Sequence, residues 1–234
     1  MNDCQIFHFY PISLHFNFPQ LPLLEIDGLR LVQTQATLRY LARRANLNGM
    51  STTEEVTCDM YAEAVCDMLD MLKKAPWTRL KKEETTIKEE DSIENPRNNE
   101  MSNEAQEHII ATRKKWHAML GPRLEQRLVE NYGRMQKELN SSYHMDNNEG
   151  KEQLTFQPCL VGQNLTYADI LVAHLVTWLI EEIGCSCVEN YPHILRLQQR
   201  VVKLPGIMNF LGSNLYYNVG DEKYCKEVDL SLAR

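Results

Sequence analysis

Residues 165–170 read LTYADI, and this short stretch predicts where the central helix of the chain begins. The hydroxyl of Thr166 can accept a hydrogen bond from the backbone N–H of Asp169, and the carboxylate of Asp169 can accept one from the N–H of Thr166. This reciprocal arrangement is a capping box, here with aspartate in place of the usual glutamate or glutamine. Leu165 and Ile170 occupy the positions of a hydrophobic staple, which fixes how the chain enters a helix.

The helix that follows is expected to run to about Glu182 and to lie at the centre of the fold. A helix that is apolar nearly all round is usually buried on every side. The apolar positions here are Ile170, Leu171, Val172, Leu175, Val176, Trp178 and Leu179. Further along, Tyr191-Pro192 predicts another helix with proline in its first turn, and Pro205-Gly206 is expected to end it.

Two more helices are predicted upstream of this centre. Residues 51–76 carry a wide apolar stripe at helical spacing, with Thr52 or Thr53 as the cap. A helical pattern returns over about 109–139, with a break expected near Gly121.

A charged stretch separates these two helices. Of the 29 residues in 79–107, 14 are charged and the apolar ones are isolated. Such a segment buries too little surface to offset the entropy of ordering the chain. We expect 79–107 to be a mobile insertion, either a loop or a solvated extension of a helix.

The N-terminal part predicts a β-hairpin followed by a helix. Residues 21–26 read LPLLEI and residues 29–32 read LRLV, and Asp27-Gly28 joins them. An Asp-Gly pair is a strong hairpin signal, because glycine readily adopts the positive φ that tight hairpin turns require. From Gln33 the apolar spacing becomes helical, and the residues around Gly49 are expected to end that helix.

Composition excludes several classes of protein. The 234 residues carry a net charge of −7 and are 43% apolar, which argues against a disordered chain and against non-specific nucleic-acid binding. No run of about 18 apolar residues predicts a membrane span, and we expect no membrane partner. The spacing of the seven cysteines fits neither a disulfide framework nor a zinc site. We therefore expect free thiols, no bound metal and a cytoplasmic location.

Several segments together resemble the cytosolic glutathione transferases, closest to the alpha class. The resemblance rests on residues 18–28, 31–34, 59–61, 160–170, 191–192 and 204–205. It implies an α/β plus all-α fold, in which a thioredoxin-like domain precedes an all-helical one. The corresponding domains would be 1–49 for glutathione binding and 50–234 for the helical part. It also implies a homodimer that conjugates glutathione, a co-substrate rather than a cofactor, to small hydrophobic electrophiles in detoxification.

The resemblance assigns glutathione-binding roles to Gln20, Leu21, Pro22, Gln33, Thr34 and Asp67. Leu21 would pair its backbone with the cysteinyl part of glutathione, and Pro22 would be a cis proline beside it. Gln33 and Thr34, joined by Gln20, would hold the γ-glutamyl end at a helix start, where free N–H groups favour a carboxylate. Asp67 would reach across the dimer to the γ-glutamyl ammonium.

Phe18 would be the aromatic residue that inserts into the partner subunit. From the residues alone, each of these assignments has a structural alternative. Gln33 and Thr34 also suit an ordinary polar helix start, Asp67 a solvated helix acid, and Phe18 a hydrophobic residue before a strand. Thr166 and Asp169 form a structural cap on either interpretation.

The departures from the family pattern concern catalysis. Only 17 residues precede Phe18, where the family has a strand, a helix and a second strand. In the family, this part carries the catalytic tyrosine and an arginine beside the thiolate. If residues 7–10 correspond to the first strand, Phe9 stands where tyrosine is wanted, and Tyr10 is one position away. The alpha-class arginine from the partner subunit is replaced by Met119. We therefore expect an impaired transferase; the alternatives are a glutathione-binding ligand carrier or a non-catalytic binding or scaffold protein.

Overall fold

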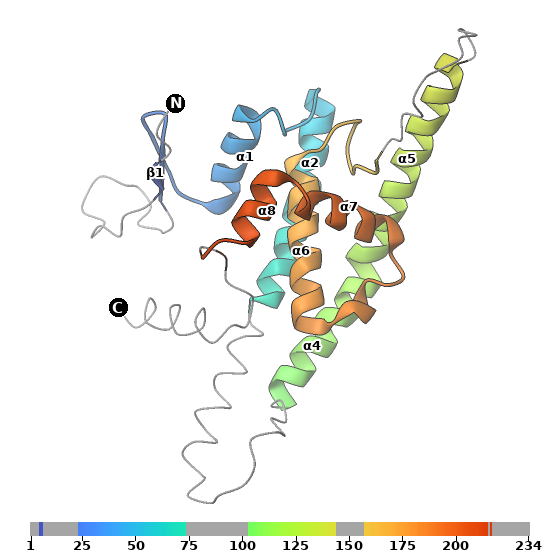
Figure 1. The fold of residues 1–234 in the computed structure, drawn as a ribbon. Coiled ribbons are helices and arrows are strands. Elements are labelled where there is room, and N and C mark those ends of the chain that lie inside the picture. The colour runs from blue at the N-terminus through green and yellow to red at the C-terminus, as the bar shows by residue number, and fades with distance from the viewer. Residues whose placement is uncertain (1–4, 7–22, 74–102, 144–156, 215, 217–234) are drawn as a thin grey trace, which may run out of the picture.

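The structure is a computed structural model that describes residues 5–6, 23–73, 103–143, 157–214 and 216 (Figure 1). Five residues with predicted roles lie outside these ranges, namely Tyr10, Phe18, Gln20, Leu21 and Pro22. The predicted insertion 79–107 lies outside them as far as residue 102.

A small antiparallel sheet opens the described chain, in the order β1 (Gln5–Ile6), β2 (Leu24–Ile26) and β3 (Leu29–Leu31). The β2–β3 hairpin turns at Asp27 and Gly28, whose φ angles are 52° and 75°. Two successive residues at positive φ are typical of the type I′ turn, whose twist matches that of the strands. The predicted hairpin is therefore present, with shorter strands than the sequence pattern indicates.

Helix α1 (Thr34–Arg44) follows the sheet and is tied to the hairpin through Asp27. The Asp27 carboxylate accepts a 2.8 Å hydrogen bond from the Tyr40 hydroxyl and another of 2.8 Å from Nε of Arg44. The bond from Tyr40, with the Arg44 guanidinium beside it, lowers the pKa of Asp27. The hairpin and α1 thus hold one another in place.

The rest of the described chain is helical, so an α/β part precedes an all-α part. Its elements in chain order are α2 (Thr52–Leu72), α4 (Asn103–Lys115), a π-helical segment (Trp116–Leu120), α5 (Gly121–Tyr143), α6 (Tyr167–Ile183), a 3-10 turn (Cys185–Cys187), α7 (Pro192–Val202) and α8 (Pro205–Leu211).

Helix α6 lies at the centre of this part, with α2 and α7 packed along it (Figure 1). Val172, Leu175 and Leu179 are completely buried, which confirms the predicted central helix. The ring of His174 on α6 packs edge-on against Trp178, with the centroids 5.4 Å apart. Within the described ranges, no helix combines the length and the apolarity needed to cross a bilayer.

Several helix ends differ from those predicted. Ser51 caps α2 and accepts a 3.2 Å hydrogen bond from the N–H of Glu54. The prediction of Thr52 or Thr53 as the capping residue was therefore wrong. Helix α4 already begins at Asn103, inside the stretch predicted as an insertion. Pro205 opens α8 as well as following α7, because proline suits the first turn of a helix.

The break predicted near Gly121 is wrong, since the helix continues there through the π-helical segment. A Cβ atom on Gly121 would lie 2.9 Å from Cε2 of Trp116 and 3.0 Å from Cζ of Tyr191. These two rings meet edge to face, with centroids 5.6 Å apart. The glycine therefore serves close packing between α5 and the start of α7 rather than chain termination.

The capping box at the start of α6 is present and completely buried. The Asp169 carboxylate accepts from the N–H of Thr166 at 2.7 Å, from the Thr166 hydroxyl at 2.8 Å and from the N–H of Leu160 at 2.8 Å. Burial raises the pKa of Asp169, while these hydrogen bonds act in the opposite direction. The bond to Leu160 also joins the preceding loop to the helix, which the sequence pattern did not indicate.

Candidate functional site

The connection from β3 into α1 places two predicted glutathione-binding residues side by side. Gln33 is the residue before the helix, with φ 71° and ψ 109°, and its carbonyl accepts the first helical hydrogen bond, from Thr37 at 3.0 Å. A residue other than glycine rarely adopts a positive φ, and such strained positions cluster at ligand-binding sites. The side chains of Gln33 and Thr34 are both exposed.

This helix start favours an anionic group. The N–H groups of the first turn, from Thr34 to Ala36, precede the first intrahelical bond and have no acceptor within the helix. The side chain of Gln33 does not cap these N–H groups, and the first turn contains no acidic residue. The positive end of the helix dipole and these N–H groups together suit a carboxylate, and the Thr34 hydroxyl can add a donor.

Gln35, in the first turn of α1, contacts α2. Its amide nitrogen donates to the sulfur of Cys66, while its Oε1 atom is buried with no hydrogen-bond partner among the described residues. Asp67 follows Cys66 on α2 and is exposed. Burial raises the pKa of the Cys66 thiol, so this thiol is a structural contact rather than a reactive one.

A polar network fixes α1 against the helical part of the protein. Nε of Arg39 donates to the Asp59 carboxylate at 3.0 Å, and its Nη2 pairs with Glu63. The hydroxyl of Tyr167, the first residue of α6, also donates to Asp59. The bond to Asp59 raises the pKa of Arg39, and burial followed by the same carboxylate raises the pKa of Tyr167.

A backbone contact reinforces this network, because the N–H of Tyr167 donates to the carbonyl of Leu47 at 2.8 Å. The start of α6, and with it the capping box, therefore supports the segment that follows α1. Sequence reasoning missed this coupling, since the partners Arg39, Asp59 and Tyr167 carry no signal of their pairing along the chain.

Five described cysteines are free, namely Cys58, Cys66, Cys159, Cys185 and Cys187. Burial raises the pKa of both Cys58 and Cys187 to about 11, which keeps these thiols protonated at neutral pH. Within the described ranges, no group of three histidine, cysteine or acidic side chains is arranged to hold a metal ion.

Comparisons with known proteins agree with this arrangement. Residues 112–214 match the family model for "Glutathione S-transferase, C-terminal domain". Human glutathione S-transferase A3 is 27% identical over 194 residues, which are 83% of this chain and 66% of that protein. Rat glutathione S-transferase alpha-5 is 27% identical over 210 residues, or 90% of this chain and 74% of that protein.

A solved structure shows the same fold. The prostaglandin synthase D of Nilaparvata lugens superposes with a TM-score of 0.55 at 18% identity, covering 85% of this chain and 76% of that one. A likeness at this identity concerns the fold alone. Together, the sequence matches and the fold lead to one likeness: the chain is similar to the cytosolic glutathione transferases, with a thioredoxin-like α/β part followed by an all-α domain.

Proposed function

We propose that this protein binds glutathione and conjugates it to small hydrophobic electrophiles, with the γ-glutamyl carboxylate at the start of α1. The observation that carries the proposal is the conformation of Gln33, with φ 71° and ψ 109° at the residue before the helix. A backbone strain of this kind costs roughly 1–3 kcal/mol and persists where a functional geometry needs it. We place the glutathione-binding domain at 1–49 and the helical domain at 50–234.

Weak turnover is part of the proposal. The thiol of glutathione must be ionised to attack, which requires a hydrogen-bond donor or positive charge beside it. In the resemblance, Phe9 stands at the position of the catalytic tyrosine, and Met119 at that of the alpha-class arginine. Met119 is 46% exposed on the π-helical segment and supplies no charge. A non-catalytic binding protein of the same family is the alternative.

Replacing Thr34 with valine should weaken glutathione binding by about tenfold or more. The substitution removes a donor to a charged carboxylate, and such hydrogen bonds contribute about 1.5–3 kcal/mol. Isothermal titration calorimetry of the purified chain with glutathione measures the change. Thr37→Val is the matched control, because Thr37 lies one turn further along and its N–H is already bonded to Gln33. Equal affinities of the two variants would contradict the assignment of this helix start.

We also propose a homodimer that uses the exposed face of α2. Val56, Met60 and Asp67 lie on one side of this helix, and Val56 and Met60 are 54% and 67% exposed. Exposed apolar residues grouped on one face mark association surfaces.

The chain should accordingly sediment at twice its mass of 27.2 kDa, and Met60→Lys should shift it towards the monomer. Met50→Lys is the control, since Met50 is 77% exposed and lies outside α2. Analytical ultracentrifugation at micromolar concentration gives the masses. A monomeric parent chain, or equal dissociation of both variants, would argue against this face.

A further inference from the structure

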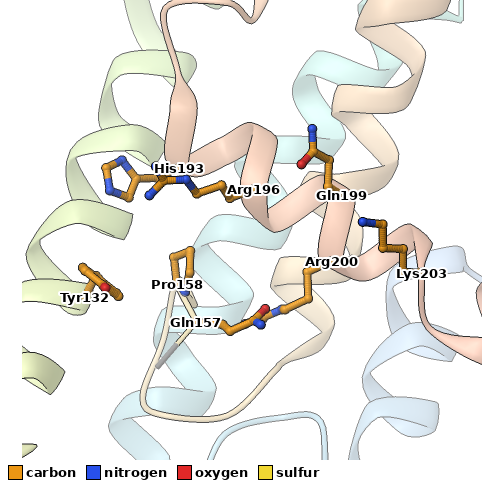
Figure 2. A pocket seen from close by; sticks show the side chains of 8 residues that line it. All are labelled: Tyr132, Gln157, Pro158, His193, Arg196, Gln199, Arg200 and Lys203. Carbon is orange, nitrogen blue, oxygen red and sulfur yellow. The ribbon is translucent and has the colours of Figure 1, made fainter. Parts of the chain in front are cut away.

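A cavity of about 390 Å³ lies on the helical domain, and no residue of α1 lines it (Figure 2). It is formed by α5, by the loop that leads into α6, and by α7. The lining residues are Tyr132, Gln157, Pro158, His193, Arg196, Gln199, Arg200 and Lys203. Cavities of roughly 300–1,000 Å³ accommodate small molecules, so this one has room for a ligand of modest size.

Three cations line this cavity from one element. Arg196, Arg200 and Lys203 are spaced by four and three residues, which places them on the same side of α7 and its end. Among the described residues, none of the three forms an ion pair, although the charge of Arg200 acts to lower the pKa of the buried Asp169 against the larger effect of burial. Arg200 donates to the sulfur of Cys159 at 3.3 Å, and sulfur is a weak acceptor. Neighbouring like charges on a helix repel one another, and a bound anion would relieve that repulsion.

Glu125 contacts the lining residue His193 and is already hydrogen bonded at the start of α7. Glu125 accepts from the backbone N–H groups of His193 and Ile194 at 3.0 Å each, and from Nδ1 of His193 at 2.7 Å. Its charge therefore compensates the start of α7 rather than the arginines further along. In a chain with a net charge of −7, the cavity is a local concentration of positive charge.

The remaining walls are suited to a ring and to polar substituents. Tyr132 and Pro158 offer flat surfaces, and the Tyr132 ring lies 6.3 Å from that of His193, centroid to centroid. The amides of Gln157 and Gln199 can donate or accept hydrogen bonds. Figure 2 shows Arg200 extending towards Gln157 and Pro158, across the cavity from α7.

We propose that this cavity binds a small organic phosphate, such as a nucleotide. The phosphate oxygens would lie between Arg196, Arg200 and Lys203, and the ring would pack against Tyr132 and Pro158. A phosphate group suits three cations because it carries nearly two negative charges and several acceptor oxygens. The planar guanidinium groups pair with such oxygens through two parallel hydrogen bonds. This site is separate from the proposed glutathione site on α1.

Calorimetric titration of the full chain with ADP tests the proposal, with inorganic pyrophosphate and glutathione as further ligands. We expect saturable ADP binding that weakens at least tenfold in Arg196→Gln and weakens with added salt. Pyrophosphate should compete with ADP, which shows that the phosphates are recognised. Arg134→Gln is the control, because it removes the same charge from an exposed position of α5 outside the cavity.

The choice of Arg196 keeps the test independent of folding, since Arg200 contacts Cys159 and is substituted only in a second variant. Thermal melting of each variant checks that the fold is intact. Absence of ADP binding to the parent chain, or equal weakening by Arg134→Gln and Arg196→Gln, would overturn the proposal. Glutathione binding that is lost in Arg196→Gln and retained in Thr34→Val would also overturn it, and would refute the proposed position of glutathione on α1.

Discussion

Replacing Asp169 with alanine is expected to lower the free energy of unfolding by about 3 kcal/mol or more. The Asp169 carboxylate is completely buried and accepts three hydrogen bonds, two from Thr166 and one from the N–H of Leu160. The substitution leaves these three donors unsatisfied inside the protein, at about 1–3 kcal/mol for each buried group. Denaturant unfolding followed by circular dichroism measures the loss.

Ser51→Ala is the matched comparison, because Ser51 is an exposed cap with one hydrogen bond, to the N–H of Glu54 at 3.2 Å. Loss of such a cap costs about 1 kcal/mol. The buried position of Asp169 should therefore make the difference between the variants clear. Equal midpoints for the two variants would show that the capping box of α6 has no special importance for the fold.

Glutathione conjugation by this chain is expected to be at least about 100-fold slower than by an alpha-class transferase assayed in parallel. The thiolate sulfur attacks the ring carbon of an aryl halide, a carbon–sulfur bond forms, the halide leaves, and the thiol proton passes to solvent. Each unit by which the thiol pKa is not lowered corresponds to about 1.4 kcal/mol between its two protonation states. Activated protein thiols lie one to five units below the free value of about 8.5.

Two substitutions near the N-terminus test whether the missing catalytic tyrosine causes the slow conjugation. Phe9→Tyr should raise the rate if Phe9 occupies the position of the catalytic tyrosine, whereas Tyr10→Phe should leave it unchanged. Steady-state assays at saturating glutathione separate the rate of turnover from binding. Family-like turnover by the parent chain would contradict the proposal of impairment, and its loss in Tyr10→Phe would identify Tyr10 as the catalytic hydroxyl.

Local signals in the sequence predicted much of the fold. The Asp27-Gly28 turn and the Thr166/Asp169 box each depend on residues within a few positions of one another, so the pattern alone indicates the geometry. The centre of the helical part was predictable for a similar reason, because a helix that is apolar nearly all round must be buried. The helix start at Gln33 was predicted as an element, but its positive φ was not.

Contacts between distant segments could not be predicted. Arg39 and Asp59 are 20 residues apart, and Tyr167 lies 108 residues from Asp59. Nothing along the chain indicates that these three meet. The packing of Trp116 and Tyr191 around Gly121 likewise turned an expected helix break into a continuous helix.

The cavity on α7 could not be predicted from the sequence either, because distant segments form it. The spacing of Arg196, Arg200 and Lys203 is visible in the sequence, and it was a signal that could have been used. The spacing indicates a binding site only together with Tyr132 and residues 157–158, which the fold places around the same cavity as these cations.

The proposed function requires glutathione to bind at the start of α1, and amide chemical shifts of the isotopically labelled chain report the binding position most directly. Titration with glutathione should move the signals of Thr34, Gln35 and Ala36 saturably, because their N–H groups face the proposed carboxylate. The dissociation constant from these shifts should agree with calorimetry. If these amides stay unchanged at millimolar glutathione in the folded protein, or if the shifts occur only at the cavity on α7, the start of α1 is not the glutathione site.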